Sequence, residues 1–414
     1  LPTPNTYRTA SGAPGHQYWQ QDVDYKINIT LNDEKQTLSG SETIDYTNNS
    51  PDTLRYLWLQ LDQNKLAENA GAKTTRSAPD KKVTYSGLRN AIETEAFNGG
   101  YNITQVAGSN GKDLPYVING TMMRIDLPKS LKSGDSVELN INWNYQLHEQ
   151  KVLGGRSGYE YFKEDDNYLY EVASWFPRAA AYYDVMGWQN KQFIGSGEFT
   201  LEFGDYDVSI TVPADHVVAA TGVLQNPKQV LSKTQRNRLA KAKKANKPVL
   251  VITPEEALEN EKSRSSKTKT WEFEAKNVRD FAFASSRKFI WDAQGYKGGK
   301  TETMAMSYYP NEGNPLWEKY STESIIHTME QYNKYTFDYP YPVSISVNGP
   351  VGGMEYPMIT FNGPRPTLDK KTGEKTYSRA TKYGLVGVII HEVGHNYFPM
   401  IVNSDERQWT WMDE

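Results

Sequence analysis

The sequence predicts a multidomain protein, with a large antiparallel β domain followed by a mixed α and β section. The chain has 414 residues, which exceeds the roughly 100 to 200 residues of an ordinary single domain. Apolar and polar residues alternate with a period of two through the first two thirds of the chain, as in strands with one buried face. Longer segments with helical character replace this alternation afterwards. We therefore predict a β-rich N-terminal domain over residues 1–292 and a second unit over 293–414.

The strands of the first domain are predicted from four segments in which apolar residues occupy alternate positions. These positions are Tyr25, Ile27, Ile29 and Leu31; Met123, Ile125 and Leu127; Val137, Leu139, Ile141, Trp143 and Tyr145; and Tyr206, Val208, Ile210 and Val212. Turn-forming residues at 48–51 and 109–112 separate such runs. This spacing is typical of strands joined by short turns.

A charged insertion at about 226–268 interrupts the β pattern. Its first part, 228–247, contains eight Lys and Arg residues and no acid. Thr253 and Glu256 then form a capping-box pattern around Pro254, which predicts the start of a helix. The insertion is consistent with binding of an anionic partner, or with a solvated charged surface balanced by the glutamates that follow.

The second unit begins with a helix-compatible segment from Pro315 to about Tyr335. A strand is expected at 343–347, and a second helix at 379–398 with Pro399 as its stop signal. All the residues with recognisable chemistry lie in this unit, so we expect the active part of the protein here.

Composition excludes several classes of function. A net charge of −4 gives no general attraction to nucleic acid. No apolar run approaches the ~20 residues of a membrane span. There are no cysteines, which excludes disulfides and thiol chemistry. The absence of an initiator methionine before Leu1 predicts a removed N-terminal segment, and we expect an extracytoplasmic (periplasmic or secreted) protein, with a cytoplasmic one as the alternative.

The segment HEVGH, at His391 to His395, predicts a metal site. Two of the chain's six histidines lie here, one helical turn apart, so both imidazoles can reach one ion. Glu392 lies on an adjacent face, where it can act on water without binding the metal. Hydrolytic zinc sites use three protein ligands, and the carboxylate of Glu414, nineteen positions after His395, completes such a set. The alternative is a pair of core histidines near an unrelated glutamate.

The sequence here resembles the gluzincin aminopeptidases, a family that includes alanyl aminopeptidases and leukotriene hydrolase. HExxH, eighteen further residues and a glutamate within W-x-x-E match the family pattern without a gap. The resemblance implies that His391, His395 and Glu414 bind one Zn²⁺ per chain and that Glu392 is the general base. It also implies that residues 293–414 form the first part of a thermolysin-like α+β catalytic domain. The remainder of that domain, with a transition-state-stabilising tyrosine, is expected after Glu414 or as a separate segment.

A second motif, GGMEYP, begins at Gly352. Gly352 and Gly353 allow close approach of a substrate backbone, and the segment Gly353-Met354-Glu355 ends in a carboxylate. The family keeps its G-x-M-E-N segment at this point, so the resemblance implies that Gly352, Gly353, Met354 and Glu355 bind substrate. Glu355 suits the free α-ammonium group of a peptide. Tyr356 replaces the family's usual asparagine.

These motifs predict a zinc aminopeptidase that hydrolyses the N-terminal peptide bond of peptide substrates. Glu171, in the β domain, is a further candidate for amine binding. Two alternatives remain open: a zinc endopeptidase, and a non-catalytic binding or scaffold protein that retains a peptidase-like site. Glu355 distinguishes an aminopeptidase from a zinc endopeptidase, because an endopeptidase has no use for an ammonium-binding carboxylate.

Overall fold

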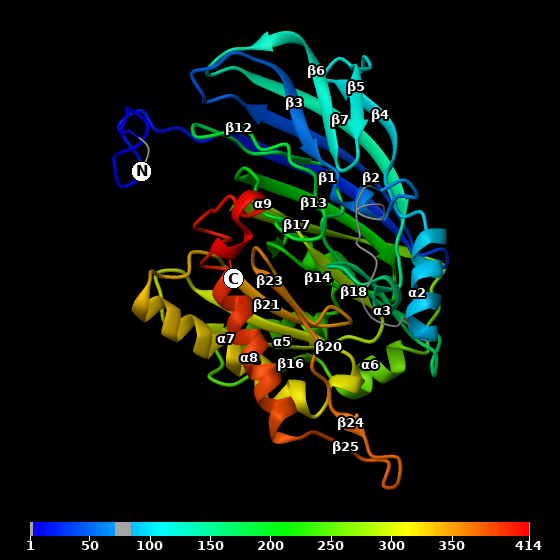
Figure 1. The fold of residues 1–414 in the computed structure, drawn as a ribbon. Helices are drawn as coiled ribbons and strands as arrows, with labels where there is room; N and C mark the ends of the chain where they lie inside the picture. Colours follow the sequence, from blue (N-terminus) through cyan, green and yellow to red (C-terminus); the bar gives the residue numbers. More distant parts are fainter. Residues whose placement is uncertain (1–2, 71–83, 414) are drawn as a thin grey trace.

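The computed structural model describes residues 3–70 and 84–413. In Figure 1 the long strands of the first part lie in the upper half of the molecule, and the helices α7 and α8 lie in the lower half together with the strands β16, β20 and β21. The two parts share one continuous core of buried apolar side chains. The molecule is strongly β-rich, as the sequence predicts.

A seven-stranded sheet forms the largest layer of the first part. Its strand order is β15-β17-β13-β1-β2-β7-β4. The bounds are β1 Asp22–Asn32, β2 Thr37–Thr47, β4 Asn102–Gly108, β7 Ser136–Gln146, β13 Gly204–Pro213, β15 Val223–Leu224 and β17 Thr268–Val278. In β1 every second side chain is buried, from Val23 to Leu31, so the period of two reflects a sheet with one face in the core.

One pairing in this sheet differs from the predicted antiparallel arrangement. β1 and β13 run parallel, with Tyr25 opposite Tyr206 and Ile29 opposite Ile210. Alternation of apolar residues is the same in parallel and antiparallel strands, so the sequence pattern could not distinguish the two. The other pairs in the sheet, in the described residues, are antiparallel.

Two four-stranded sheets complete the first part. One has the order β10-β3-β6-β5 and the other β14-β18-β9-β8. Their bounds are β3 Leu54–Gln60, β5 Tyr116–Asn119, β6 Met122–Leu131, β8 Gly158–Phe162, β9 Asn167–Val172, β10 Arg178–Ala179, β14 Val217–Ala220 and β18 Phe283–Ser286. Glu171 is the next-to-last residue of β9, and its side chain contacts Val351 of the second part.

A six-stranded mixed sheet lies at the centre of the second part, with the order β16-β19-β20-β21-β23-β22. Its bounds are β16 Val249–Ile252, β19 Ile290–Tyr296, β20 Thr303–Tyr309, β21 Val343–Asn348, β22 Gly353–Tyr356 and β23 Ile359–Asn362. β16 comes from the charged insertion and β19 crosses the predicted boundary at 292. The boundary stays a prediction, but this sheet takes strands from both sides of it.

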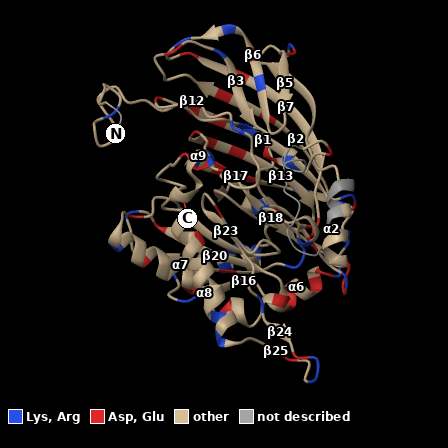
Figure 2. Cartoon of the chain, in the orientation of Figure 1, with Lys and Arg blue, Asp and Glu red and all other residues tan. Residues whose placement is uncertain are grey.

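The charged insertion is partly helical, as predicted. It contains α4 (Pro227–Val230), α5 (Lys233–Ala242) and α6 (Pro254–Asn260). Thr253 caps α6 in a complete capping box with Glu256, which confirms the sequence pattern. In Figure 2, Lys and Arg residues are interspersed with Asp and Glu residues over the whole molecule, in agreement with its small net charge.

Helices α7 (Leu316–Tyr335) and α8 (Arg379–His395) pack against each other and against one face of the six-stranded sheet (Figure 1). The predicted helix 315–335 and strand 343–347 are confirmed. The helix predicted over 379–398 ends earlier, at His395. The N–H groups of Asn396 and Tyr397 donate hydrogen bonds to the last carbonyl groups of the helix. Pro399 also disfavours helical backbone at the residue before it.

The remaining elements are short or peripheral. They are α2 (Tyr85–Ala96), α3 (Gln150–Leu153), α9 (Glu406–Trp409), the hairpins β11 (Tyr182–Tyr183) with β12 (Gly187–Trp188) and β24 (Thr367–Leu368) with β25 (Lys375–Thr376), and the 3-10 turns η1 (Asp62–Leu66), η2 (Asn311–Gly313) and η3 (Thr410–Met412). None of the helices in the described part of the chain combines the length and apolar character that a membrane crossing requires.

Candidate metal centre

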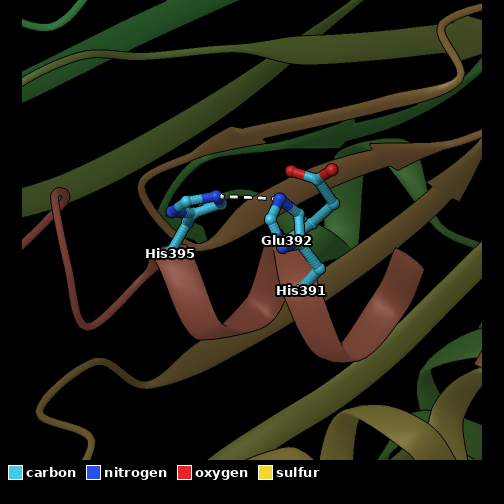
Figure 3. Close-up of side chains that lie close together, drawn as sticks. All are labelled: His391, Glu392 and His395. Atoms are coloured by element: carbon cyan, nitrogen blue, oxygen red, sulfur yellow. Dashed lines mark hydrogen bonds between the residues drawn. The ribbon is translucent and has the colours of Figure 1, made fainter. Parts of the chain in front are cut away.

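The last turn of α8 brings the two predicted histidine ligands together. Ser378 caps the start of this helix by accepting a hydrogen bond from the Thr381 N–H, at 3.0 Å. His391 and His395 then project from the same face, and their Nε2 atoms lie 3.1 Å apart (Figure 3). His391 is exposed and His395 is buried, so the pair lies at the edge of the core.

A backbone carbonyl fixes the tautomer of His395. Its Nδ1 lies 3.0 Å from the carbonyl oxygen of Phe398, which can only accept a hydrogen bond. Nδ1 therefore carries the proton, and in the neutral ring Nε2 keeps a lone pair that faces His391. Metal-binding histidines commonly show this arrangement, in which a second partner orients the ring.

The geometry of the two rings fits a shared zinc ion. Two ligands that each lie about 2.0–2.1 Å from one tetrahedral zinc are separated by roughly 3.3 Å, close to the distance between the two Nε2 atoms. Among the described residues, His391, Glu392 and His395 form one group of closely spaced ligand atoms, and Glu355, His395 and Asp413 form another. Imidazole nitrogens with nearby carboxylates are the donors that zinc takes in hydrolytic sites.

Glu392 lies against the strand β22. Its side chain is buried, and its carboxylate lies near the two imidazole rings in Figure 3. A Cβ atom placed on Gly353 would lie 2.5 Å from Glu392 Oε1 and 3.0 Å from the Val388 side chain. Any larger residue at position 353 would occupy space that the Glu392 carboxylate fills. The first motif and the second motif are thus in direct contact.

Glu355, on β22, is buried beside the same centre. Burial raises the pKa of Glu355 well above its ordinary value, and the nearby carboxylates of Glu392, Asp413 and Glu198 raise it further. Crowding of acids around one carboxyl makes its ionised form costly unless a cation is present. The site is therefore suited to a positively charged group.

The side chains on either side of Glu355 face the core. Met354 and Tyr356 are both buried, and the Tyr356 ring packs against Phe199 and Phe361 with centroids 5.5 Å away in each case. Tyr356 therefore contributes packing where the family pattern has an amide. Met354 leaves only its backbone for a substrate to contact, whereas Gly352 is exposed.

Asn396, which sequence reasoning did not single out, ties the hairpin of β22 and β23 to α8. Its Oδ1 accepts a hydrogen bond from the Met358 N–H at 2.6 Å. Met358 has a φ of 66°, in the left-handed region, at the turn between the two strands. Asn396 directly follows HEVGH, but its partner is 38 residues away, so no spacing rule predicts this contact.

Glu171 approaches the glycine-rich loop from the β domain. Its Oε2 accepts a hydrogen bond from the Val351 N–H at 2.8 Å, and a Cβ atom on Gly349 would clash with its carboxyl group. Burial raises the pKa of Glu171 well above its ordinary value, and the Val351 N–H partly offsets this. The structure thus brings Glu171 next to the Gly352–Gly353 segment, and its role toward a substrate amine stays a prediction.

Glu414, the predicted third ligand, lies outside the described residues, so its assignment also stays a prediction. Its neighbour Asp413 lies close to the histidines, with Oδ1 3.5 Å from His395 Nδ1. Position 413 was not predicted as a site residue, although it precedes Glu414 directly. The end of η3 therefore lies at the metal centre.

Solved structures show the same fold. Neither a family model nor a curated protein matches the chain. An M1 zinc metallopeptidase from Deinococcus radiodurans aligns with a TM-score of 0.57 and 14% identity, over 97% of this chain and 70% of that one. The chain has the fold of a two-domain M1 zinc metallopeptidase.

Two ligand-bound structures extend this M1-like comparison. A two-domain M1 zinc metallopeptidase E323A mutant bound to L-arginine has a TM-score of 0.55 and 14% identity, over 95% of this chain and 68% of that one. The D. radiodurans E323A mutant bound to a Tyr-Ser-Ala substrate has a TM-score of 0.53 and 14% identity, over 97% of this chain and 70% of that one. At 14% identity, the similarity to these M1 structures shows a shared fold.

Proposed function

We propose that this chain is a zinc-dependent aminopeptidase. The observation that carries the proposal is the meeting of two motifs at one centre, with the Glu355 carboxylate close to the His395 ring that faces His391. A metal-binding pair beside a buried carboxylate suits a peptide that presents its first carbonyl to the metal and its free amine to an acid. The M1-like fold and the peptide-bound neighbour support this proposal.

His391 and His395, with Glu414, would hold the zinc ion, which supplies Lewis acidity toward water and the peptide carbonyl oxygen. Glu392 accepts the proton of the attacking water and delivers it to the departing amine. Glu355 binds the α-ammonium group and so positions the first peptide bond. The backbone at Gly352 and Gly353 allows the substrate to lie close to α8.

The test is hydrolysis of one peptide series with free and with acetylated N-termini by the zinc-loaded protein. We expect the free peptides to be cleaved at the first bond, with kcat/KM at least about tenfold above that of the acetylated ones. A charge-assisted hydrogen bond is worth about 1.5–3 kcal/mol, which corresponds to a factor of about ten to a hundred. In Glu355→Ala this preference should largely disappear.

Equal cleavage of free and acetylated peptides by the wild-type protein would overturn the aminopeptidase proposal and favour a zinc endopeptidase. Stoichiometric zinc with no cleavage of either series would instead favour a non-catalytic peptidase-like protein. Glu259→Ala, at an exposed position on α6, is the matched control for removal of a glutamate side chain. It should leave the preference for free termini unchanged.

A further inference from the structure

A cavity of about 370 Å³ lies on one face of the six-stranded sheet. Its walls include Met304, Met306 and Tyr308 of β20. Ser307, between them in sequence, points the other way and hydrogen-bonds to Ser321 of α7. The cavity is therefore on the sheet face opposite to α7 and α8, and it is separate from the metal centre.

The walls of this cavity are almost entirely apolar. They combine the basic helix α5 with strands of both large sheets. The apolar lining residues are Val218, Ala220, Val223, Leu224, Pro227, Leu239, Ala240, Trp271, Phe273, Trp291, Met304, Met306, Tyr308, Val343 and Ile345. A volume of this size, walled by aromatic and aliphatic groups with few polar ones, is typical of sites for small apolar ligands.

The two charged side chains at this cavity are both hydrogen-bond donors. Arg236 and Lys243, at the α5 side, are the only charged residues among the described lining residues. Arg236 uses one nitrogen on the Leu231 carbonyl, and Lys243 lies 3.4 Å from Glu302 in an exposed ion pair. Both keep further N–H groups for another acceptor.

Two tryptophan side chains form part of the cavity wall. Trp271 and Trp291 line the cavity and are each only 2% exposed. Neither Nε1–H has a hydrogen-bond partner among the described residues. A buried donor without a partner is costly, and an indole N–H can only donate. Both Nε1 atoms are themselves buried, so the two rings present apolar surface to the cavity, and the donors open to a ligand are those of Arg236 and Lys243.

We propose that this cavity binds an apolar monocarboxylate, of the kind represented by a medium-chain fatty acid. The hydrocarbon tail packs between the aromatic residues of β17 and β19 and the methionines of β20. The carboxylate lies on the α5 side, where it faces Arg236 and Lys243. The proposal thus gives a role to two of the basic residues of the charged insertion, Arg236 and Lys243.

The first experiment is calorimetric titration of the intact protein with decanoate, decanol and decyltrimethylammonium, each below its aggregation concentration. We expect one decanoate per chain, with a rise in the thermal unfolding midpoint. Decanol should bind about tenfold or more weakly, because it lacks the charge that Arg236 and Lys243 recognise. Equal affinity for all three ligands, or no saturable binding of decanoate, would overturn the proposal.

Two pairs of variants locate the site. Ala240→Trp fills the cavity from an exposed position on α5, and Asn237→Trp adds the same side chain on that helix away from the cavity. Lys243→Met removes a lining cation, and Lys241→Met removes a lysine outside the lining. We expect Ala240→Trp to abolish decanoate binding and Lys243→Met to weaken it several-fold, while both controls bind as wild type does.

These experiments do not depend on the metal centre, so they stand apart from the proposed peptidase function. Circular dichroism of each variant establishes that it is folded before titration. Decanoate binding by folded Ala240→Trp with wild-type affinity would show that the ligand binds elsewhere and would overturn the assignment. Loss of binding in Asn237→Trp as well as in Ala240→Trp would do the same.

Discussion

Glu392 and His391 are neighbours in the chain but have different surroundings. His391 is exposed at the edge of the site, whereas Glu392 is buried against β22. An exposed imidazole can bind a metal that also binds substrate, and a buried carboxylate keeps a fixed position for proton transfer. The two residues should therefore respond differently to substitution.

Glu392→Gln should retain zinc and lose nearly all turnover. The amide keeps the size of the side chain but cannot accept the proton, and general acid–base catalysis is worth roughly 10² to 10⁴ in rate. Metal content and kcat of the same preparations are the measurements. His391→Ala is the contrasting variant, in which zinc itself should be lost. A zinc-loaded Glu392→Gln with wild-type kcat would contradict the assignment of the general base.

The contact between α8 and β22 joins the two motifs at the scale of elements. Gly353 faces the Glu392 carboxylate, and Asn396 holds the Met358 turn at the other end of the hairpin. The sequence identifies each motif by local spacing, but it contains no local signal for their contact, because that depends on how the hairpin packs on the helix. For the same reason the participation of β16 in the six-stranded sheet could not be predicted.

Gly353→Ala should lower kcat about ten- to a hundredfold with little effect on stability. The new methyl group would lie 2.5 Å from Glu392 Oε1, at the far end of the Glu392 side chain, so the carboxylate has to shift. The protein then folds, but the base is displaced, and displacements of about 1 Å can cost a hundredfold in rate. Gly384→Ala, at an exposed position on α8, is the matched control, since its Cβ meets nothing within 4 Å among the described residues. Similar kcat values for both variants would contradict this account.

At the scale of the whole molecule, local patterns predicted much of the architecture. The period of two in β1, the capping box at Thr253 and the helix starting after Pro315 all depend on neighbouring residues, and the structure confirms them. The strands β1 and β13, which pair in parallel, are separated by more than a hundred residues of chain. Their pairing therefore has no signal in the local sequence of either strand. The HEVGH motif and Glu355 could be found from the sequence, whereas the positions of Asp413 and Glu198 near Glu355 could not.

Buried acids in the core should make the stability of the whole molecule depend on pH. Asp292, on β19, accepts a hydrogen bond from the Tyr309 hydroxyl at 2.7 Å, and burial raises the pKa of its carboxyl group to about 7. Its ordinary pKa is 3.8, so above that pH the unfolded chain releases a proton that the folded chain keeps. The contribution of Asp292 is therefore fully present at low pH and is lost as the pH rises toward about 7, by roughly 1.4 kcal/mol per pH unit.

Asp292→Asn should remove this part of the pH dependence. Asparagine has nearly the same size and no proton to release, so the free energy of unfolding of the variant should fall less than that of wild type between about pH 5 and about pH 7. Urea unfolding at the two pH values measures the difference. Asp207→Asn, on the exposed face of β13, is the control and should follow the wild-type profile. If Asp292→Asn loses as much stability as wild type over this range, Asp292 is ionised in the folded protein, and its hydrogen bonds outweigh its burial.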